Sequence, residues 1–260
     1  MRKQLRRIAF FALPAALIVS LCFYVNSRYV FPVLMYHSVA PVAKNMLTLS
    51  PESFERQMAF LKSNGYHVLT FGQAAEVIQG RRKPAKSLTI TFDDGKEDNY
   101  RFAFPVLKKY GLPATIFLIY AKIGTPGFLD WGEIREMQSS GLITFGSHTL
   151  HHLVLTKLSE QEIAEEVAGS KKLLEEKLGE KVDFFAYPLG IFDARSRKAV
   201  VDAGYLAAVA TNPGHRSSDN DRFLIKRLRI SENSRFLPVF VLESSGYYNL
   251  IREKRQKRGE

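Results

Sequence analysis

Short apolar segments alternate with longer polar stretches along the chain, and this alternation restricts the fold more than any other feature. Most of these segments are unbroken runs of β-branched and aromatic residues, which is typical of parallel strands covered on both faces. The predicted strands span 32–36, 67–71, 87–92, 114–120, 142–146, 183–187, 206–211 and 223–230. The sequence therefore indicates an α/β protein with a parallel sheet and right-handed crossovers.

The stretches between these strands carry the signals that start helices. Ser50 is a predicted N-cap followed by Pro51 at the first helical position. Ser159 and Glu162 form a capping box, and Asp193 is predicted to cap a further helix. Strands and helices in this order favour a distorted (β/α) barrel of about seven parallel strands, with an open sheet as the alternative. In both folds ligands bind where the strands end.

The formal net charge of +11 lies mostly at the two ends of the chain. Four of the first seven residues are Lys or Arg, and the last nine residues, "REKRQKRGE", hold five basic and two acidic side chains. A nucleic-acid-binding domain carries its basic stripe on the folded body. We therefore expect no nucleic acid partner; basic ends are more typical of contact with anionic lipid or of a solvated terminus.

No charged side chain occurs between Arg7 and Arg28. This apolar stretch is long enough for a marginal membrane span, so residues 1–28 are predicted to be an uncleaved signal anchor. A cleaved signal peptide and a buried helix are the alternatives, although bulky residues follow where a peptidase requires small ones. Cys22, the only cysteine, lies here, and Leu21 precedes it where a lipoprotein signal has a small residue.

This anchor determines the expected compartment of the rest of the chain. The basic residues before it keep the N-terminus in the cytoplasm, which places the remainder outside, in the periplasm or the extracellular space. A cleaved segment would instead yield a secreted protein. We expect a single folded domain over 29–245 and a basic tail over 246–260.

Candidate catalytic side chains follow three of the predicted strands. Strand 87–92 ends in Asp93 and Asp94, strand 142–146 in "GSHTLHHL", and strand 32–36 in His37. Each feature has a plainer interpretation, since Asp-Gly is a common turn dipeptide and a histidine pair can lie on a solvated face. Their joint position at one rim of the sheet favours a functional site.

Two histidines and one carboxylate form a common open site for a divalent metal. His148 and His152 are four residues apart, so one helical turn would place both rings on one side. His151 then points elsewhere. Successive strand residues face opposite ways, so only one of Asp93 and Asp94 binds the metal readily, and the other is free to accept a proton from water. Zn²⁺ is the first choice; Co²⁺ and Ni²⁺ also suit these ligands.

The segments "TFDDG", "SHTLHH" and "FAYPLG" resemble the first three motifs of the polysaccharide deacetylases (NodB homology, carbohydrate esterase family 4). The similarity spans about residues 31–231, and the first two motifs together are highly specific. The resemblance implies a metal-dependent hydrolase on a distorted (β/α) barrel that removes N-acetyl groups from polysaccharides. Residues 29–245 are accordingly expected to form a polysaccharide deacetylase domain.

The resemblance also implies a role for each matching residue. By position, Asp93 is similar to the general base of the family, and Asp94, His148 and His152 to its metal ligands. In the third motif, the backbone N–H of Leu189 is expected to hold the oxyanion. Tyr187 and Pro188 are expected to shape the adjoining wall of the substrate site.

Two departures from the family pattern affect this assignment. Ala186 stands where the third motif usually has an arginine, and the late strand carries no histidine. An early "VLMYHSV" instead resembles the circularly permuted branch that includes bacterial poly-N-acetylglucosamine deacetylases, which implies that His37 is the general acid. The sequence reveals no acid that orients His37. Arg227 or Arg229 is a candidate to replace the missing arginine near Asp93.

Trp131 allows two interpretations. It lies in "FLDWGEI", where Asp130 and Glu133 form a capping-box-like pair at a helix start. Its ring is predicted either to stack on a sugar in the substrate groove or to be buried as a helix residue.

The expected function is removal of N-acetyl groups from an N-acetylglucosamine polysaccharide outside the cytoplasm, with acetate and free amines as products. Poly-β-1,6-N-acetylglucosamine is the favoured polymer, and peptidoglycan and chitin-type chains are alternatives. Two other functions compete: a catalytically weak relative that binds glycan, and a hydrolase of the same fold acting on another amide or ester bond.

Overall fold

A computed structural model describes residues 29–42, 46–80, 84, 86–211 and 221–248, together with residues 20, 23 and 24. The predicted signal anchor of residues 1–28 lies almost wholly outside this part, as does most of the basic tail. Across the described residues, no helix has the length and apolar character needed to cross a membrane.

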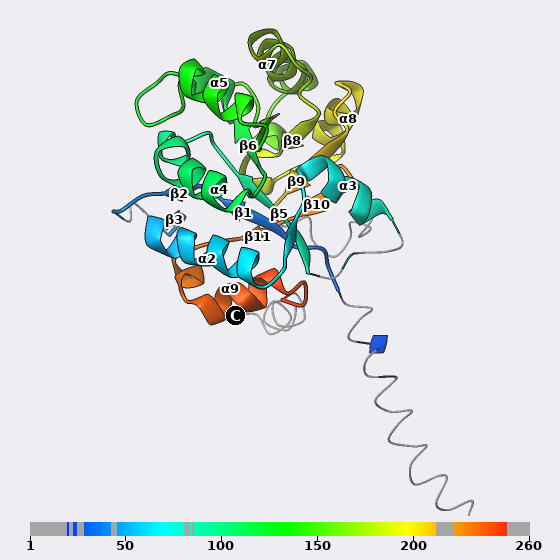
Figure 1. Ribbon diagram of the computed structural model, residues 1–260. Helices are drawn as coiled ribbons and strands as arrows, with labels where there is room; N and C mark the ends of the chain where they lie inside the picture. Colours follow the sequence, from blue (N-terminus) through cyan, green and yellow to red (C-terminus); the bar gives the residue numbers. More distant parts are fainter. Residues whose placement is uncertain are drawn as a thin grey trace, which may run out of the picture.

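Seven parallel strand positions form a nearly closed barrel, which confirms the predicted (β/α) barrel (Figure 1). Six of them are, in spatial order, β1 (Val33–Tyr36), β5 (Ser87–Phe92), β6 (Ala114–Leu118), β7 (Ile143–Ser147), β8 (Phe184–Ala186) and β9 (Ala207–Ala210). The seventh is split into β10 (Ile225–Lys226) and β11 (Leu228–Arg229). β10 pairs with β9 and β11 pairs with β1, so this last segment closes the barrel between its first and sixth strands.

The predicted strand over 67–71 is wrong in its second half. Only β4 (His67–Val68) pairs with β5, and the chain then enters α3 (Phe71–Gln79). Thr70 accepts a hydrogen bond from the Gln73 backbone and Gln73 reaches back to the backbone of Thr70, so a capping box starts the helix here. A second small sheet joins β2 (Ser38–Val39) to β3 (Thr48–Leu49).

Helices surround the strands, with α2 and α9 together at the lower edge of Figure 1 and α7 and α8 at the upper edge. The predicted N-caps Ser50, Ser159 and Asp193 all accept a backbone N–H, which confirms these three helix starts. Besides α3, the α-helices of the described residues are α2 (Pro51–Ser63), α4 (Phe104–Tyr110), α5 (Trp131–Ser139), α6 (Glu160–Ala164), α7 (Ser170–Leu178), α8 (Ala194–Asp202) and α9 (Leu237–Ser244). Wider π-helical turns, Asn99–Ala103 and Glu165–Gly169, precede α4 and α7.

Alternation along the strands divides the apolar side chains into two clusters. Outward residues such as Leu34 and Ile90 pack with the helices. Inward residues pack with α3, where the ring of Phe71 meets those of Phe117 and Phe184 at 6.0 and 5.0 Å. Because Phe184 is the first residue of β8, this cluster fills the amino-terminal end of the barrel, and the carboxyl end is left for polar groups.

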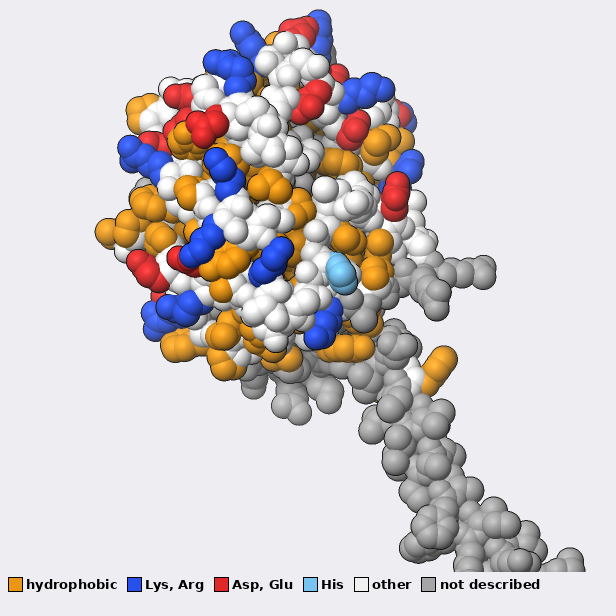
Figure 2. All heavy atoms as spheres, in the orientation of Figure 1, with side chains coloured by type: hydrophobic (Ala, Val, Ile, Leu, Met, Phe, Trp, Pro, Cys, Tyr) orange, Lys and Arg blue, Asp and Glu red, His pale blue; other side chains and the backbone are white. Residues whose placement is uncertain are grey.

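Charged side chains are interspersed with other types on one face of the molecule. On the face drawn in Figure 2, Lys and Arg side chains alternate with acidic and hydrophobic ones and do not gather in one stripe.

Candidate active site

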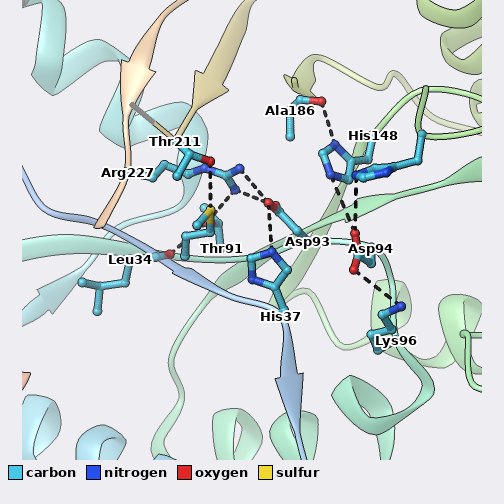
Figure 3. A network of polar contacts seen from close by, with 12 residues as sticks. Leu34, His37, Thr91, Asp93, Asp94, Lys96, His148, Ala186, Thr211 and Arg227 are labelled. Carbon is cyan, nitrogen blue, oxygen red and sulfur yellow. Dashed lines mark hydrogen bonds and ion pairs between the residues drawn. The ribbon is translucent and has the colours of Figure 1, made fainter. Parts of the chain in front are cut away.

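Asp93 extends β5 into the carboxyl end of the barrel. Its backbone N–H donates to the carbonyl of Tyr36, so it continues the pairing with β1, and only 3 % of the residue is exposed. Both terminal nitrogens of Arg227 donate to the carboxylate. Nη1 lies 2.5 Å from Oδ1, and Nη2 lies 2.7 Å from Oδ2 (Figure 3). Such a bidentate pair fixes both the position and the charge of the carboxylate.

Arg227 reaches this place because of the split in the last strand. It lies between β10 and β11, at the step where the chain changes partner, and its side chain is fully buried inside the barrel. Its guanidinium also lies 5.6 Å from the centre of the Phe117 ring. Of the two arginines considered from sequence, Arg227 therefore replaces the one missing at Ala186, whereas Arg229 is exposed.

Opposing effects act on the pKa of Asp93. Burial alone raises the pKa, but the charge of Arg227 and its hydrogen bonds outweigh that effect and hold the pKa well below its usual range. Asp93 is therefore ionised at neutral pH in spite of its burial.

His37 follows β1 and faces Asp93 across a short gap. Its Nε2 lies 4.0 Å from Oδ2 of Asp93. Among the described residues no group bonds to its buried Nδ1, so no separate acid orients the ring. The backbone is held instead, because the Asn99 side chain donates to the His37 carbonyl at 2.8 Å. Burial lowers the pKa of His37 below 6.5, although Asp93 and Asp94 act in the opposite direction.

The Asp98–Asn99 pair was not recognised in the sequence as part of the site. Asp98 is buried and accepts hydrogen bonds from the Ser38 hydroxyl (2.5 Å) and the Val39 N–H (3.2 Å). Together with Asn99 it fixes the backbone on both sides of the His37 carbonyl. The only signal in the sequence was the polar run "KEDN", which follows Gly95 after the aspartate pair.

Asp94 leaves the strand and turns away from Asp93. Its φ of 72° is left-handed, and Gly95 follows with φ 67°. A Cβ on Gly95 would lie 2.7 Å from the Leu118 side chain, so glycine is required by space as well as by φ. The divergence of the two carboxylates therefore arises from this turn, and not from the strand alternation that was expected.

His148 and His152 approach Asp94 from the loop after β7. The distances from Oδ1 of Asp94 to the Nε2 atoms are 3.8 Å for His148 and 3.9 Å for His152. The helical turn expected between the two histidines is absent: Thr149 and His152 have φ values of 69° and 63°, and the Thr149 hydroxyl accepts the His152 N–H. A loop with two left-handed residues thus brings the rings together.

The three side chains fit a divalent metal. One potential ligand atom from each of Asp94, His148 and His152 lies within 4.8 Å of the others. Nδ1 of His148 lies 2.7 Å from the carbonyl of Ala186; donating there leaves the Nε2 lone pair facing the cluster. Burial lowers the pKa of His148 to about 4, so its ring is neutral, as a metal ligand requires.

His151 lies outside this cluster, as expected. Its Nδ1 is 2.6 Å from Oε1 of Glu166, a nearly buried acid in the π-helical turn before α7. Oε2 of Glu166 accepts the His151 N–H at 2.9 Å. This pair anchors the loop that carries the two candidate ligands.

The third motif forms a sharp turn after β8. Leu189 has φ 56° and is 62 % exposed, whereas Tyr187 and Pro188 are buried. Gly190 is also left-handed, and a Cβ there would lie 2.3 Å from the Thr211 backbone nitrogen. Tyr187 packs behind the turn against Phe185 and Phe192. Its ring therefore supports the turn from inside, and the part of Tyr187 and Pro188 in shaping the substrate wall stays a prediction.

Trp131 is the first residue of α5 and is half-buried against the core, with its ring 6.2 Å from that of Tyr120. Asp130 and Glu133 form the capping box that starts this helix, which confirms the interpretation of that pair. The structure gives Trp131 a packing role; contact with sugar stays a prediction.

Comparison with known proteins agrees with this geometry. A family model for polysaccharide deacetylase matches residues 80–208, a range that includes Asp93, Asp94, His148, His152 and Leu189. His37 and Arg227 lie outside it. The Bacillus subtilis protein YxkH, whose name places it with the polysaccharide deacetylases, is 40% identical over 201 residues, which are 77% of this chain and 71% of that protein.

Two further relatives carry specific names. A Staphylococcus aureus poly-beta-1,6-N-acetyl-D-glucosamine N-deacetylase is 30% identical over 200 residues, 72% of this chain and 69% of the relative. The structure of IcaB from Ammonifex degensii superposes with a TM-score of 0.74 at 28% identity and covers 84% of this chain and 97% of that one. The chain described here belongs to the polysaccharide deacetylase family, whose members hydrolyse amide bonds.

Proposed function

We propose that this protein removes N-acetyl groups from an N-acetylglucosamine polysaccharide and leaves acetate and free amines. One observation carries the proposal: an ionised carboxylate, Asp93, lies 4.0 Å from the imidazole of His37. A proton acceptor and a proton donor thus stand together at the carboxyl end of the barrel, beside a ligand cluster. Amide hydrolysis needs both, one for the attacking water and one for the leaving amine.

Asp93 is the proposed general base. Arg227 keeps it ionised and orients it, so an oxygen of the carboxylate is available to take a proton from water. His37 is the proposed general acid and donates a proton to the departing nitrogen. Because its pKa is lowered by burial, the protonated form gives up its proton readily.

The backbone N–H of Leu189 is the proposed oxyanion donor. The left-handed turn at Leu189 and Gly190 presents this segment at the surface beside β9. A backbone donor fixed by the fold needs no reorganisation during the reaction.

Asp94, His148 and His152 are the proposed metal ligands, with Zn²⁺ favoured and Co²⁺ or Ni²⁺ as alternatives. A bound divalent ion supplies Lewis-acid polarisation of the acetyl carbonyl and lowers the pKa of water. The hydrogen bond from His148 to Ala186 orients one ligand, and the Glu166–His151 pair steadies the loop that carries both histidines.

Poly-β-1,6-N-acetylglucosamine is the favoured substrate because the Staphylococcus aureus relative is named for it. Peptidoglycan and chitin-type polymers are the alternatives. We also propose that residues 1–28 anchor the domain in the membrane with the active site outside the cytoplasm, or yield a secreted domain if they are cleaved. The apolar stretch of the sequence supports that part of the proposal.

Acetate release from these three polymers tests the function. The purified protein is stripped with a chelator, reconstituted with Zn²⁺, Co²⁺ or Ni²⁺, and assayed for acetate and for new free amines. Equal amounts of both products from poly-β-1,6-N-acetylglucosamine support the proposal. Binding of the polymer without acetate release would instead establish a catalytically weak glycan-binding relative. Turnover of simple esters or other amides alone would establish a hydrolase of the same fold that acts on another bond.

A further inference from the structure

Lys96 lies beside the candidate metal cluster and has no role in the function proposed above. Its Nζ is 3.5 Å from Oδ2 of Asp94 (Figure 3). The other oxygen of that carboxylate, Oδ1, is the one that faces His148 and His152. The two oxygens of Asp94 thus have different partners: one faces the ligand cluster, and the other faces a lysine.

The lysine is held in this position by the fold. Its backbone forms an antiparallel bridge with Phe128, and the residues on both sides are tied to the same segment. The Leu129 N–H donates to the Gly95 carbonyl at 2.9 Å, and the Glu97 N–H donates to the Gly127 carbonyl at 3.1 Å. The backbone is therefore hydrogen-bonded on both sides of Lys96.

The side chain is fixed as well. The ammonium group lies 4.0 Å from the centre of the Phe128 ring, which provides a cation–π contact, and 29 % of the side chain is exposed. The left-handed turn at Asp94 and Gly95 directs the chain back, so the ammonium meets the carboxylate two residues earlier.

We propose that Lys96 is a positioning residue that restricts Asp94 to a single ligating oxygen. A carboxylate can bind a cation through one oxygen or two. With Oδ2 facing the ammonium, only Oδ1 is available to the cluster, and the third protein ligand occupies one coordination position. More positions then stay open for water and substrate, as a catalytic site requires. The inference rests on the proposed metal site of Asp94, His148 and His152.

Lys96 also weakens metal binding. A positive charge next to a ligating carboxylate repels an incoming cation, and the lysine competes with it for the same acid. Lys96 thus keeps coordination positions open and at the same time lowers the affinity of the site for the metal. The loss of Lys96 should tighten metal binding while it slows turnover.

Co²⁺ titration of the full-length protein tests this inference, because the visible absorption of bound Co²⁺ weakens as its coordination number rises. In Lys96→Met we expect a weaker band than in the wild type, at least about fivefold tighter Co²⁺ binding in chelator competition, and a lower kcat with little change in KM. Lys96→Arg keeps the charge and should stay close to the wild type.

Lys122→Met is the matched control. The Nζ of Lys122 also lies over the Phe128 ring, at 5.9 Å from the ring centre. This variant should keep the wild-type spectrum and affinity. If Lys96→Met has the wild-type spectrum, or binds Co²⁺ no more tightly, the inference is wrong although the metal site stands. If the wild type itself binds no Co²⁺, the proposed metal site and the inference fail together.

Discussion

Asp93 and Asp94 are neighbours in sequence but belong to two different regions of the site. Asp93 continues a buried strand and forms a fully protected ion pair inside the barrel with Arg227. Asp94 lies in a left-handed turn at the partly exposed rim with His148, His152 and Lys96. The interior region fixes a charge by packing, whereas the rim region brings ligands together through loops. A single peptide bond therefore separates the buried Asp93–Arg227 ion pair from a cluster that is open to ligands.

The largest expected effect is on the interior region. Asp93→Asn removes the proposed base while its shape is kept, so kcat should fall by about 10²- to 10⁴-fold. Because the ligand cluster lies across the turn, metal content measured by atomic emission should be unchanged. Full activity in a metal-loaded Asp93→Asn protein would contradict the assignment of the base. Loss of both activity and metal would mean that the two regions are not separable.

Arg227→Met should lower the free energy of unfolding because it removes the partner of a buried carboxylate. It leaves Asp93 buried without its partner, and breaking such a pair costs about 3–5 kcal/mol in free energy of unfolding. Urea unfolding monitored by circular dichroism measures this loss. Since the pKa of Asp93 is lower in the folded than in the unfolded state, the pair stabilises the protein above about pH 4 and this stabilisation is lost as the pH falls.

One control variant accompanies that prediction. Arg229→Met removes an exposed arginine from the same final segment and should change the free energy of unfolding by less than about 0.5 kcal/mol. A comparable loss of unfolding free energy in both variants would show that any substitution in the last strand destabilises the protein, and that the buried ion pair contributes nothing specific.

The rim region is tested by Asp94→Asn. The amide keeps the size of the side chain but removes the charge that a divalent ion requires, so Zn²⁺ affinity should fall about 100-fold or more. Competition with a chromophoric chelator measures the affinity, and added Zn²⁺ should restore part of the activity. Unchanged stability in urea is expected because Asp94 is not part of the packed interior; a large loss there would contradict the division into two regions.

The contrast also explains what the sequence could predict. Local patterns were sufficient to predict the barrel. Unbroken apolar runs mark the strands, and capping residues such as Ser159 mark the helix starts, and both depend only on nearby residues. They also placed Asp93, His148 and His37 at one rim, because parallel strands end together. Arg227 was one of two candidates, since the split between β10 and β11 depends on how the last strand meets β9 and β1, which no local pattern encodes. The turns at Asp94 and His152 were missed because non-glycine residues rarely adopt left-handed φ.

The pH profile distinguishes the acid from the base. His37 must be protonated to donate, so activity should fall as the pH rises through its pKa. Burial lowers that pKa, and the basic limb of kcat/KM should therefore lie below the usual histidine value of about 6.5. Asp93 itself should contribute no acidic limb above about pH 4, because it stays ionised there. The limb should vanish in His37→Gln; if it persists at the same pH in that variant, another group is the acid.

The smallest expected effect concerns Leu189. The proposed oxyanion donor is its backbone N–H, and the side chain is 62 % exposed, so Leu189→Gly should keep kcat within about threefold of the wild type. Glycine relieves a left-handed φ of 56° by about 1 kcal/mol, while its greater freedom in the unfolded chain costs a similar amount, so stability should hardly change. A loss of more than tenfold in kcat with normal stability and metal content would contradict this prediction. Because the backbone N–H is present in both proteins, such a loss would show that the exposed leucine side chain contributes to turnover as a substrate contact.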